Sequence, residues 1–157
     1  SGLSTSTSDP ARLEVDGLHH ALLAGLAASV EHLASLDEAA TGSRRERLVT
    51  SIGSLNGYLR RLTAYLAESV SHLDFVHMVG SAAERVPTAS FTVDGVTADK
   101  VARRLADNGI CALVDQPSRA LDVIGVGDVG GAITIGLGQY STPYEVDQFV
   151  RCLGSLG

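Results

Sequence analysis

Glycines 125, 127 and 130 have the spacing of a dinucleotide-binding loop. Such a loop works only where it follows a strand and opens a helix, because the N-terminus of the helix holds the pyrophosphate. Here the glycines precede an apolar, strand-like segment at 132–137, and no acidic residue follows at the ribose spacing. We therefore predict a turn at this position.

Chemistry that needs a primary amine in a pocket has one candidate residue in this sequence. Lys100 is the only lysine, and the other basic side chains are arginines. A lysine amine can hold a carbonyl compound as an imine, provided that the amine lies in a pocket. Lys100 falls in a segment with helical periodicity at 98–107. We expect it on a helix surface.

Thiols and imidazoles complete the inventory of reactive side chains. Cys111 and Cys152 lie in apolar stretches and match no metal-ligand spacing, so we predict two packed thiols in a reducing compartment. The five histidines include no pair at i and i+4, so the sequence does not predict a zinc site. Of the histidines, we retain only His20 as a pocket candidate. No Ser-His-Asp set can be argued from the spacing.

Size and charge restrict the function classes. The chain has 157 residues, of which 45% are apolar, and this composition is typical of a globular protein. A net charge of −6 argues against nucleic acid or an anionic membrane as the partner. No apolar run approaches the ~18–20 residues of a membrane span, and no secretory signal pattern is present. We expect a cytoplasmic protein.

Two helices are predicted in the first half, after a flexible lead at 1–10 and a short strand at 12–16. Residues 19–36 predict a helix that is apolar almost all the way round, so this helix should be buried on several sides. The rest of this chain offers too little surface to cover it. Ser43 and Glu46 form a capping box that opens a helix over 43–71, about 40 Å long. Arg44, Arg45 and Arg47 at its start indicate a solvated face, or contact with an acidic partner domain.

The second half alternates strands and helices. Thr142 and Glu145, with a proline between them, form a second capping box that opens the last helix. The predicted fold class is α/β, an α+β sandwich: a small mixed, mostly antiparallel sheet with helices packed on one face, preceded by a long connecting helix. In chain order the elements are strand 74–79, strand 88–93, helix 98–107, strand 110–114, a loop at 115–119, a helical turn at 120–124, strand 132–137 and the last helix.

Four stretches resemble the end of the class V aminotransferases, especially a cysteine-desulfurase-like branch. They are RLEVDGLHHALLAGLAASVEHLASL, TGSRRERLV with the long helix after it, RVPTASFTVDGVTADKVARRLADNGI, and GGAITIGLGQYSTPYEVDQFVRCL. Their order and spacing are more specific than any one of them. The resemblance covers about residues 11–153. It implies that 11–42 is the exit segment of a large domain, and that 43–157 is a connecting helix with the small C-terminal domain.

In this family the large domain carries pyridoxal phosphate on a lysine Schiff base, and the enzymes are usually homodimers with pockets built from both subunits. The resemblance places Lys100 at an ordinary surface position of the small domain. It therefore implies that this chain lacks the half that carries the cofactor. Two hypotheses stay open: the C-terminal portion of a pyridoxal-phosphate enzyme acting on an amino acid, which needs its upstream domain, or a non-catalytic α/β interaction or dimerisation module derived from that family.

The resemblance also assigns site residues. Gly17, Leu18 and His20 would lie at the cofactor, although Asp16-Gly17 stands where the family has Gly-Thr. Thr134 stands where many members have an arginine that binds the substrate carboxylate, and Arg119 is a candidate substitute for it. The 115–117 segment has no cysteine, so we expect an aminotransferase-like, lyase-like or degenerate member rather than a desulfurase.

Overall fold

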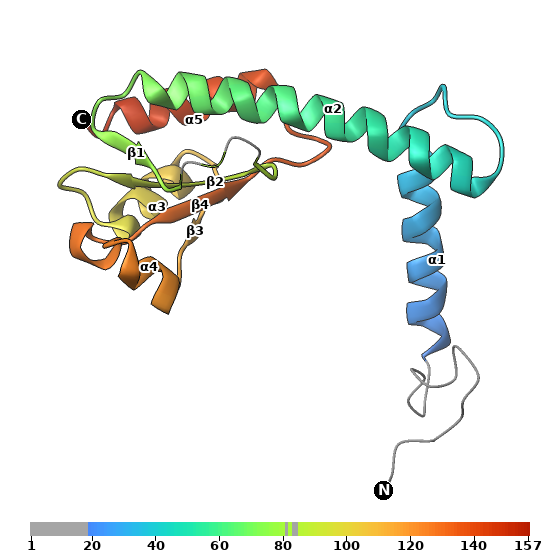
Figure 1. Ribbon diagram of the computed structural model, residues 1–157, viewed down its shortest axis with the longest axis horizontal. Coiled ribbons are helices and arrows are strands. Elements are labelled where there is room, and N and C mark those ends of the chain that lie inside the picture. Colours follow the sequence, from blue (N-terminus) through green and yellow to red (C-terminus); the bar gives the residue numbers. More distant parts are fainter. Residues whose placement is uncertain (1–18, 81, 83–84) are drawn as a thin grey trace, which may run out of the picture. The chain divides into compact units, whose positions relative to one another are not determined.

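The computed structural model describes residues 19–80, 82 and 85–157, and the predicted lead at 1–10 and strand at 12–16 lie outside them. The chain divides into two compact units, Ser1–Leu55 and Asn56–Gly157. The boundary falls within helix α2, Arg44–Ser71, so this helix belongs to both units (Figure 1). We describe each unit by itself.

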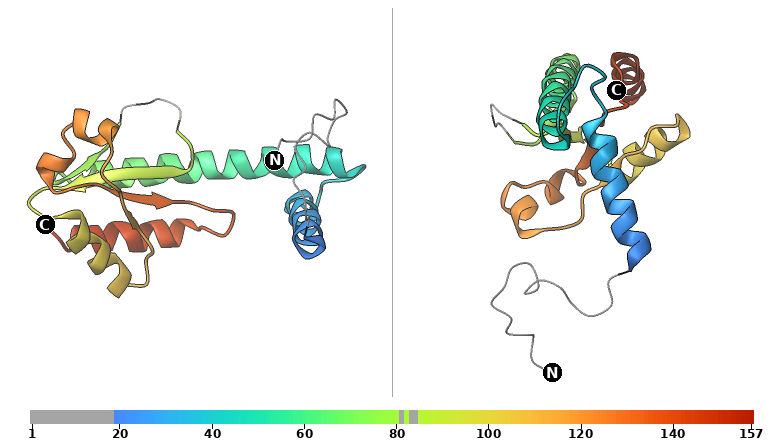
Figure 2. Two further views of the ribbon diagram at one scale, coloured as in Figure 1. Left: turned by 90° about the horizontal axis from the view of Figure 1, so that it is seen from below. Right: turned by 90° about the vertical axis from the view of Figure 1, so that its right-hand side faces the viewer.

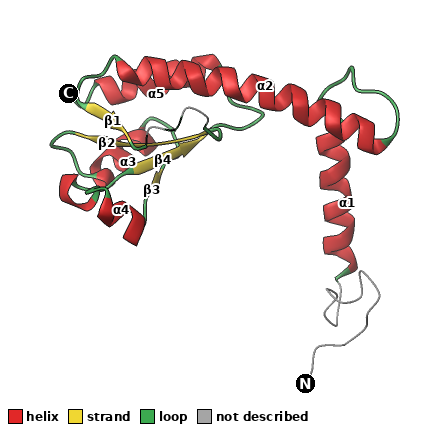
Figure 3. Ribbon diagram, viewed as in Figure 1, coloured by secondary structure: helices red, strands yellow, loops and turns green. Residues whose placement is uncertain are grey.

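In the first unit, α1 (His20–Ala34) ends against the beginning of α2, as Figure 3 shows by element type. The contact is mostly polar. The Ser51 hydroxyl donates to the Ala34 carbonyl at 3.1 Å, and the Ser54 hydroxyl donates to Asp37 Oδ2 at 2.6 Å. That second bond lowers the pKa of Asp37. Arg47 pairs with Glu31 at 2.5 Å. These contacts fix the end of α1 to α2 without a large apolar core.

The first turn of α2 is stabilised as the sequence predicted. The Ser43 N–H donates to Glu46 Oε2 at 2.8 Å, and the Glu46 N–H donates to Ser43 Oγ at 3.4 Å. These bonds satisfy N–H groups that the helix leaves without partners. The Ser43 hydroxyl also donates to Glu46 Oε2, at 2.7 Å, and this bond together with the one from the Ser43 N–H lowers the pKa of Glu46. Arg44 and Arg45 remain exposed beside them.

Most of α1 is not covered by the described part of the chain. Leu22, Leu23 and Leu26 are 71%, 44% and 63% exposed, and Ala34 is the one buried residue of this helix. An apolar surface of this kind is typical of an interaction face. The prediction that this chain offers too little surface to bury the helix is confirmed for the described residues.

The second unit is built on a four-stranded antiparallel sheet, in the order β1-β2-β4-β3. Its longer helices pack on one of its faces, and the strands and helices follow each other along the chain as predicted. Their bounds are β1 Val76–Met78, β2 Thr88–Val93, α3 Ala98–Asp107, β3 Leu113–Val114, α4 Arg119–Val123, a 3-10 turn Gly127–Val129, β4 Ile133–Gly136 and α5 Pro143–Gly154.

The core lies between the sheet and the helices α2, α3 and α5. Alternation along β2 and β4 places every second side chain on this face. Phe91 meets Phe149 edge to face, with ring centroids 5.5 Å apart. Tyr58 and Tyr65 of α2 donate to the Ser141 carbonyl and to Asp147 Oδ1, each at 2.5 Å, and so tie α2 to α5. The most deeply buried core side chains are Phe91, Leu66, Leu105, Ile133, Leu153, Val70 and Val101.

The opposite face of the sheet, which we call the outer face, is largely polar. His77, Ser90, Thr92, Thr134 and Leu113 alternate with the core residues and therefore point to this side. Helix α4 lies on this side of the sheet, away from α2 and α5 (Figures 1 and 2). The outer face is thus the side that the helices of the core leave open.

The glycine-rich segment is a turn, as predicted. Gly130 and Gly131 both have φ of +92°, in the left-handed region that favours glycine. The Gly130 carbonyl accepts from the Ala98 N–H at 3.0 Å, and a Cβ at Gly131 would lie 3.2 Å from that of Ala98. The turn therefore packs against the start of α3 and aims β4 into the sheet.

Candidate functional site

A hydrogen-bonded set of three side chains lies on the outer face of the sheet. The Thr134 hydroxyl donates to Asp115 Oδ1 at 2.7 Å, and the Ser90 and Thr134 oxygens lie 2.5 Å apart. All three residues are half-buried. We call Ser90, Thr134 and Asp115 the outer-face triad.

The sheet itself positions these side chains. Ser90 of β2 lies directly opposite Thr134 of β4, and directly opposed residues in antiparallel strands have neighbouring side chains. Asp115 follows β3, and its N–H donates to the Ala132 carbonyl at 2.9 Å, which holds its carboxylate beside β4. The triad is therefore fixed by strand register rather than by a loop.

Two charged side chains outside the triad already have partners. His77 Nε2 lies 3.0 Å from a carboxylate oxygen of Asp94, and both side chains are more than half exposed. Arg85 donates to the carbonyls of Val79 and Gly80. Among the described side chains that are hydrogen-bonded to Thr134, Asp115 is the one carboxylate.

The residues that the sequence singled out have different positions. Thr134 belongs to the triad. Arg119 is the first residue of α4, is exposed, and makes no hydrogen bond with the triad. His20 is the first residue of α1 in the other unit and is exposed. Gly17 and Leu18 lie outside the described residues. The site roles of these five residues stay predictions.

Ser90 and Asp115 were missed in the sequence analysis. A signal was present, because β2 alternates Thr88, Ser90 and Thr92 with apolar residues. Such alternation predicts a line of hydroxyls on one face. Asp115 comes directly after β3, but only the strand order β2-β4-β3 brings it to Thr134.

A lysine-bound cofactor does not fit the described residues. Lys100 is exposed on α3, the helix whose Ala98, Val101 and Leu105 pack into the core on the other side of the sheet. Its amine therefore does not lie in a pocket with the outer-face triad. The described part of the chain supplies no enclosed primary amine for pyridoxal phosphate.

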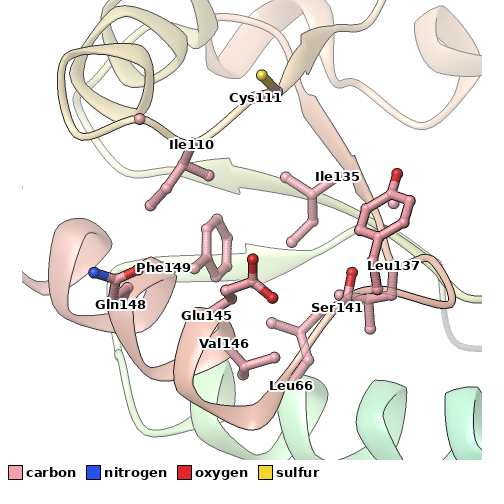
Figure 4. A pocket seen from close by; sticks show the side chains of 13 residues that line it. Leu66, Ile110, Cys111, Ile135, Leu137, Ser141, Glu145, Val146, Gln148 and Phe149 are labelled. Carbon is pink, nitrogen blue, oxygen red and sulfur yellow. The ribbon is translucent and has the colours of Figure 1, made fainter.

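A pocket of about 350 Å³ lies on the helix side of the sheet, between α5, β4 and the segment after α3 (Figure 4). Its walls are mostly apolar, with Ile110, Ile135 and Phe149 facing the space. Glu145 also lines it, but its carboxylate accepts from the Thr142 N–H at 2.7 Å as part of the second capping box. The pocket therefore holds no pair of free acid and base groups.

The prediction that both thiols are packed is wrong for Cys111. This residue is exposed at the rim of the pocket, because β3 has only two residues and the segment before it is not part of the sheet. Leu113, in the same predicted strand, is 73% exposed. Cys152 is buried as predicted, and burial raises the pKa of its thiol.

In the part of the chain that the structure describes, no group of three or more His, Cys, Asp or Glu side chains is placed to hold a metal ion. Among the same residues, no helix combines the length and apolarity needed to cross a bilayer.

Similarity to known proteins extends over most of the chain. A protein of Mycobacterium tuberculosis whose function is uncharacterized is 54% identical over 148 residues, which are 94% of this chain and 37% of that protein. The cysteine desulfurase of Thermococcus onnurineus has a similar fold, with a TM-score of 0.72 and 21% identity, over 94% of this chain and 33% of that one.

A second similar structure is that of a variant of the cystine C–S lyase C-DES, with glycine covalently linked to its pyridoxal-phosphate cofactor. Its TM-score is 0.55 with 14% identity, over 73% of this chain and 29% of that one. The chain thus spans about a third of the length of these proteins. Residues 4–149 match the class-V aminotransferase family, and the chain belongs to that family and resembles the C-terminal part of its desulfurases in fold.

Proposed function

We propose that this chain is the C-terminal portion of a pyridoxal-phosphate enzyme that acts on an amino acid, and that it is catalytically incomplete without an upstream domain bearing the cofactor lysine. The observation that carries the proposal is the outer face of the sheet. It presents an ordered polar triad, and the helices of the core all lie on the other side. A face of this kind forms one wall of a site whose other wall must come from elsewhere.

Exposed apolar side chains support this assignment. Leu113 of β3 lies opposite Thr134 and is 73% exposed. Val123, the last residue of α4, and Ile124, directly after it, are 79% and 58% exposed. Apolar side chains that surround polar ones are typical of an interface. The upstream domain would cover them and enclose the triad.

The exposed face of α1 supports the same conclusion independently. Residues 11–42 would belong to the large domain, and residues 43–157 would form the connecting helix and the small domain. The large domain would then bury Leu22, Leu23 and Leu26, which the described residues leave exposed. The enzyme would be a homodimer, with Gly17, Leu18 and His20 near the cofactor and Thr134 and Arg119 near the substrate.

The test compares this chain with the same protein extended upstream of Ser1. With added pyridoxal phosphate, the extended protein should bind the cofactor stoichiometrically and change its visible absorbance when amino acids are added. The 157-residue chain should do neither. Stoichiometric binding by this chain alone, abolished by Lys100→Arg, would contradict the proposal.

A non-catalytic interaction module is the second candidate, because Thr134 stands where many family members have an arginine and because α1 exposes an apolar face. The same experiment separates the two. An extended protein that assembles but neither binds the cofactor nor responds to any amino acid would favour the module.

A further inference from the structure

The direction of the hydrogen bonds in the outer-face triad follows from counting protons. A hydroxyl carries one proton, and a carboxylate carries none and only accepts. The Thr134 proton is donated to Asp115 Oδ1 at 2.7 Å. The Ser90 oxygen lies 2.5 Å from Thr134 Oγ1, which has no second proton to give, so Ser90 must be the donor. Ser90 therefore donates to Thr134, and Thr134 donates to Asp115.

Both hydroxyl protons are used within the triad. What the three side chains present outward is lone pairs, on the serine oxygen and on the carboxylate. Within the described residues, the second oxygen of Asp115 accepts no hydrogen bond. The triad is thus an acceptor surface that carries one negative charge.

Among the described residues, no cation is bonded to Asp115. His77 pairs with Asp94, and Arg85 is bonded to backbone carbonyls. Arg119 is exposed on α4 and is not bonded to the triad. A carboxylate placed here would meet a charge of its own sign, and the triad would offer it no donor, whereas an ammonium would find a charge partner and acceptor oxygens.

We infer that the outer-face triad binds a cationic hydrogen-bond donor, an ammonium or guanidinium group, and does not take a carboxylate. The inference rests on the proposed function in one respect, namely that the cationic group bound at the triad belongs to the substrate. The substrate is then a basic one, which carries a second ammonium or guanidinium besides the amine that reacts. Ser90 and Asp115 become specificity-determining residues together with Thr134.

The inference is tested on the 157-residue chain without any cofactor, by following backbone amide signals in NMR spectra. The probes are ethylammonium chloride and sodium propionate, titrated at neutral pH and equal ionic strength. Ethylammonium should give saturable shifts at Ser90, Thr134 and Asp115, and propionate should give none. Equal shifts with propionate, or no saturable shift with ethylammonium, would overturn the inference.

Two variants make the result specific to the triad. Asp115→Asn should weaken ethylammonium binding about tenfold, because a charge-assisted hydrogen bond is replaced by a neutral one. The control Asp122→Asn removes the same charge from an exposed position on α4 and should leave the affinity unchanged. Unchanged binding in Asp115→Asn, or an equal loss in both variants, would show that the triad is not the site.

The outcome is independent of the cofactor experiment. Ammonium binding at the triad in a protein that never binds pyridoxal phosphate would refute the proposed enzyme and leave the binding site in place. A functional enzyme whose triad prefers propionate would refute the site and leave the enzyme.

Discussion

The orientation of Thr134 depends on two neighbours from other strands. Its hydroxyl is held between Asp115 at 2.7 Å and Ser90 at 2.5 Å, so its rotamer and the direction of its proton are both fixed. The Thr134 hydroxyl cannot bind an anion as an arginine would, because its one proton is already donated to Asp115. On our inference, this position would recognise a cationic group, whereas the arginine that the resemblance implies for many family members would recognise an anionic one.

Tyr65 offers a prediction for pH dependence. Its hydroxyl donates to Asp147, and this bond is the main cause that raises the pKa of Tyr65 above its ordinary value of about 10. The neutral phenol is the form that donates, so the stabilisation is fully present below that ordinary pKa and is lost as the pH rises through the raised one.

We expect Asp147→Asn to bring the pKa of Tyr65 back towards its ordinary value. An absorbance titration of the phenolates, with Tyr65→Phe to identify the signal, measures this pKa. The account of the hydrogen bond is wrong if the Tyr65 titration is the same in Asp147→Asn as in the original chain.

The two thiols should differ in reactivity. Cys111 is exposed, whereas Cys152 is 7% exposed and burial raises the pKa of its thiol. Since the thiolate is the nucleophile, Ellman's reagent should label one thiol rapidly and the second only on unfolding. Cys111→Ser should remove the rapid phase, and Cys152→Ser should keep it. Two equal rates in the folded chain would contradict the described packing.

Sequence reasoning at this scale succeeded where a local pattern determined the result. Both capping boxes were predicted, because their partners lie three residues apart along one helix. Cys111 was placed wrongly, because an apolar run does not reveal that only its last two residues pair with β4. Asp115 was missed, because its contact with Thr134 depends on strand order.

At the scale of elements, α1 is the feature that the rest of the described chain explains least. Both of its ends were predicted within two residues. Its unusual apolarity was interpreted as a sign that a covering partner is missing. The strands of the second unit were predicted in the correct order, but were generally shorter than the apolar runs that indicated them. An apolar run does not show where the ladder of hydrogen bonds begins, and in the run 110–114 only Leu113 and Val114 pair with β4.

The exposed leucines of α1 give an element-scale prediction. In this chain, Leu22→Ser should change the free energy of unfolding by no more than about 0.5 kcal/mol, as for other exposed positions. In the protein extended upstream, where we propose that the side chain is buried, the same change should cost about 2 kcal/mol. Denaturant unfolding of both forms measures the difference.

The matched control is Arg103→Ser, which changes an exposed position of α3 and should be neutral in both forms. A Leu22→Ser variant as stable as the original in the extended protein would show that the upstream domain does not cover α1.

At the scale of the whole molecule, the chain is about a third of the length of the proteins it resembles. Its second unit contains a complete core, with aromatic and aliphatic side chains from α2, α3, α5 and the sheet. Its first unit and its outer face expose apolar side chains instead. On our proposal, the second unit is the small domain, and the exposed apolar surfaces lie where the upstream domain would cover the chain and where the substrate would bind.

The position of the cofactor amine is the claim on which the account depends. It is measured by adding pyridoxal phosphate to the protein extended upstream of Ser1, reducing with borohydride, and mapping the labelled peptide by mass spectrometry. The account predicts a pyridoxyl group on a lysine upstream of Ser1, with Lys100 unmodified. A stoichiometric label on Lys100 would contradict it.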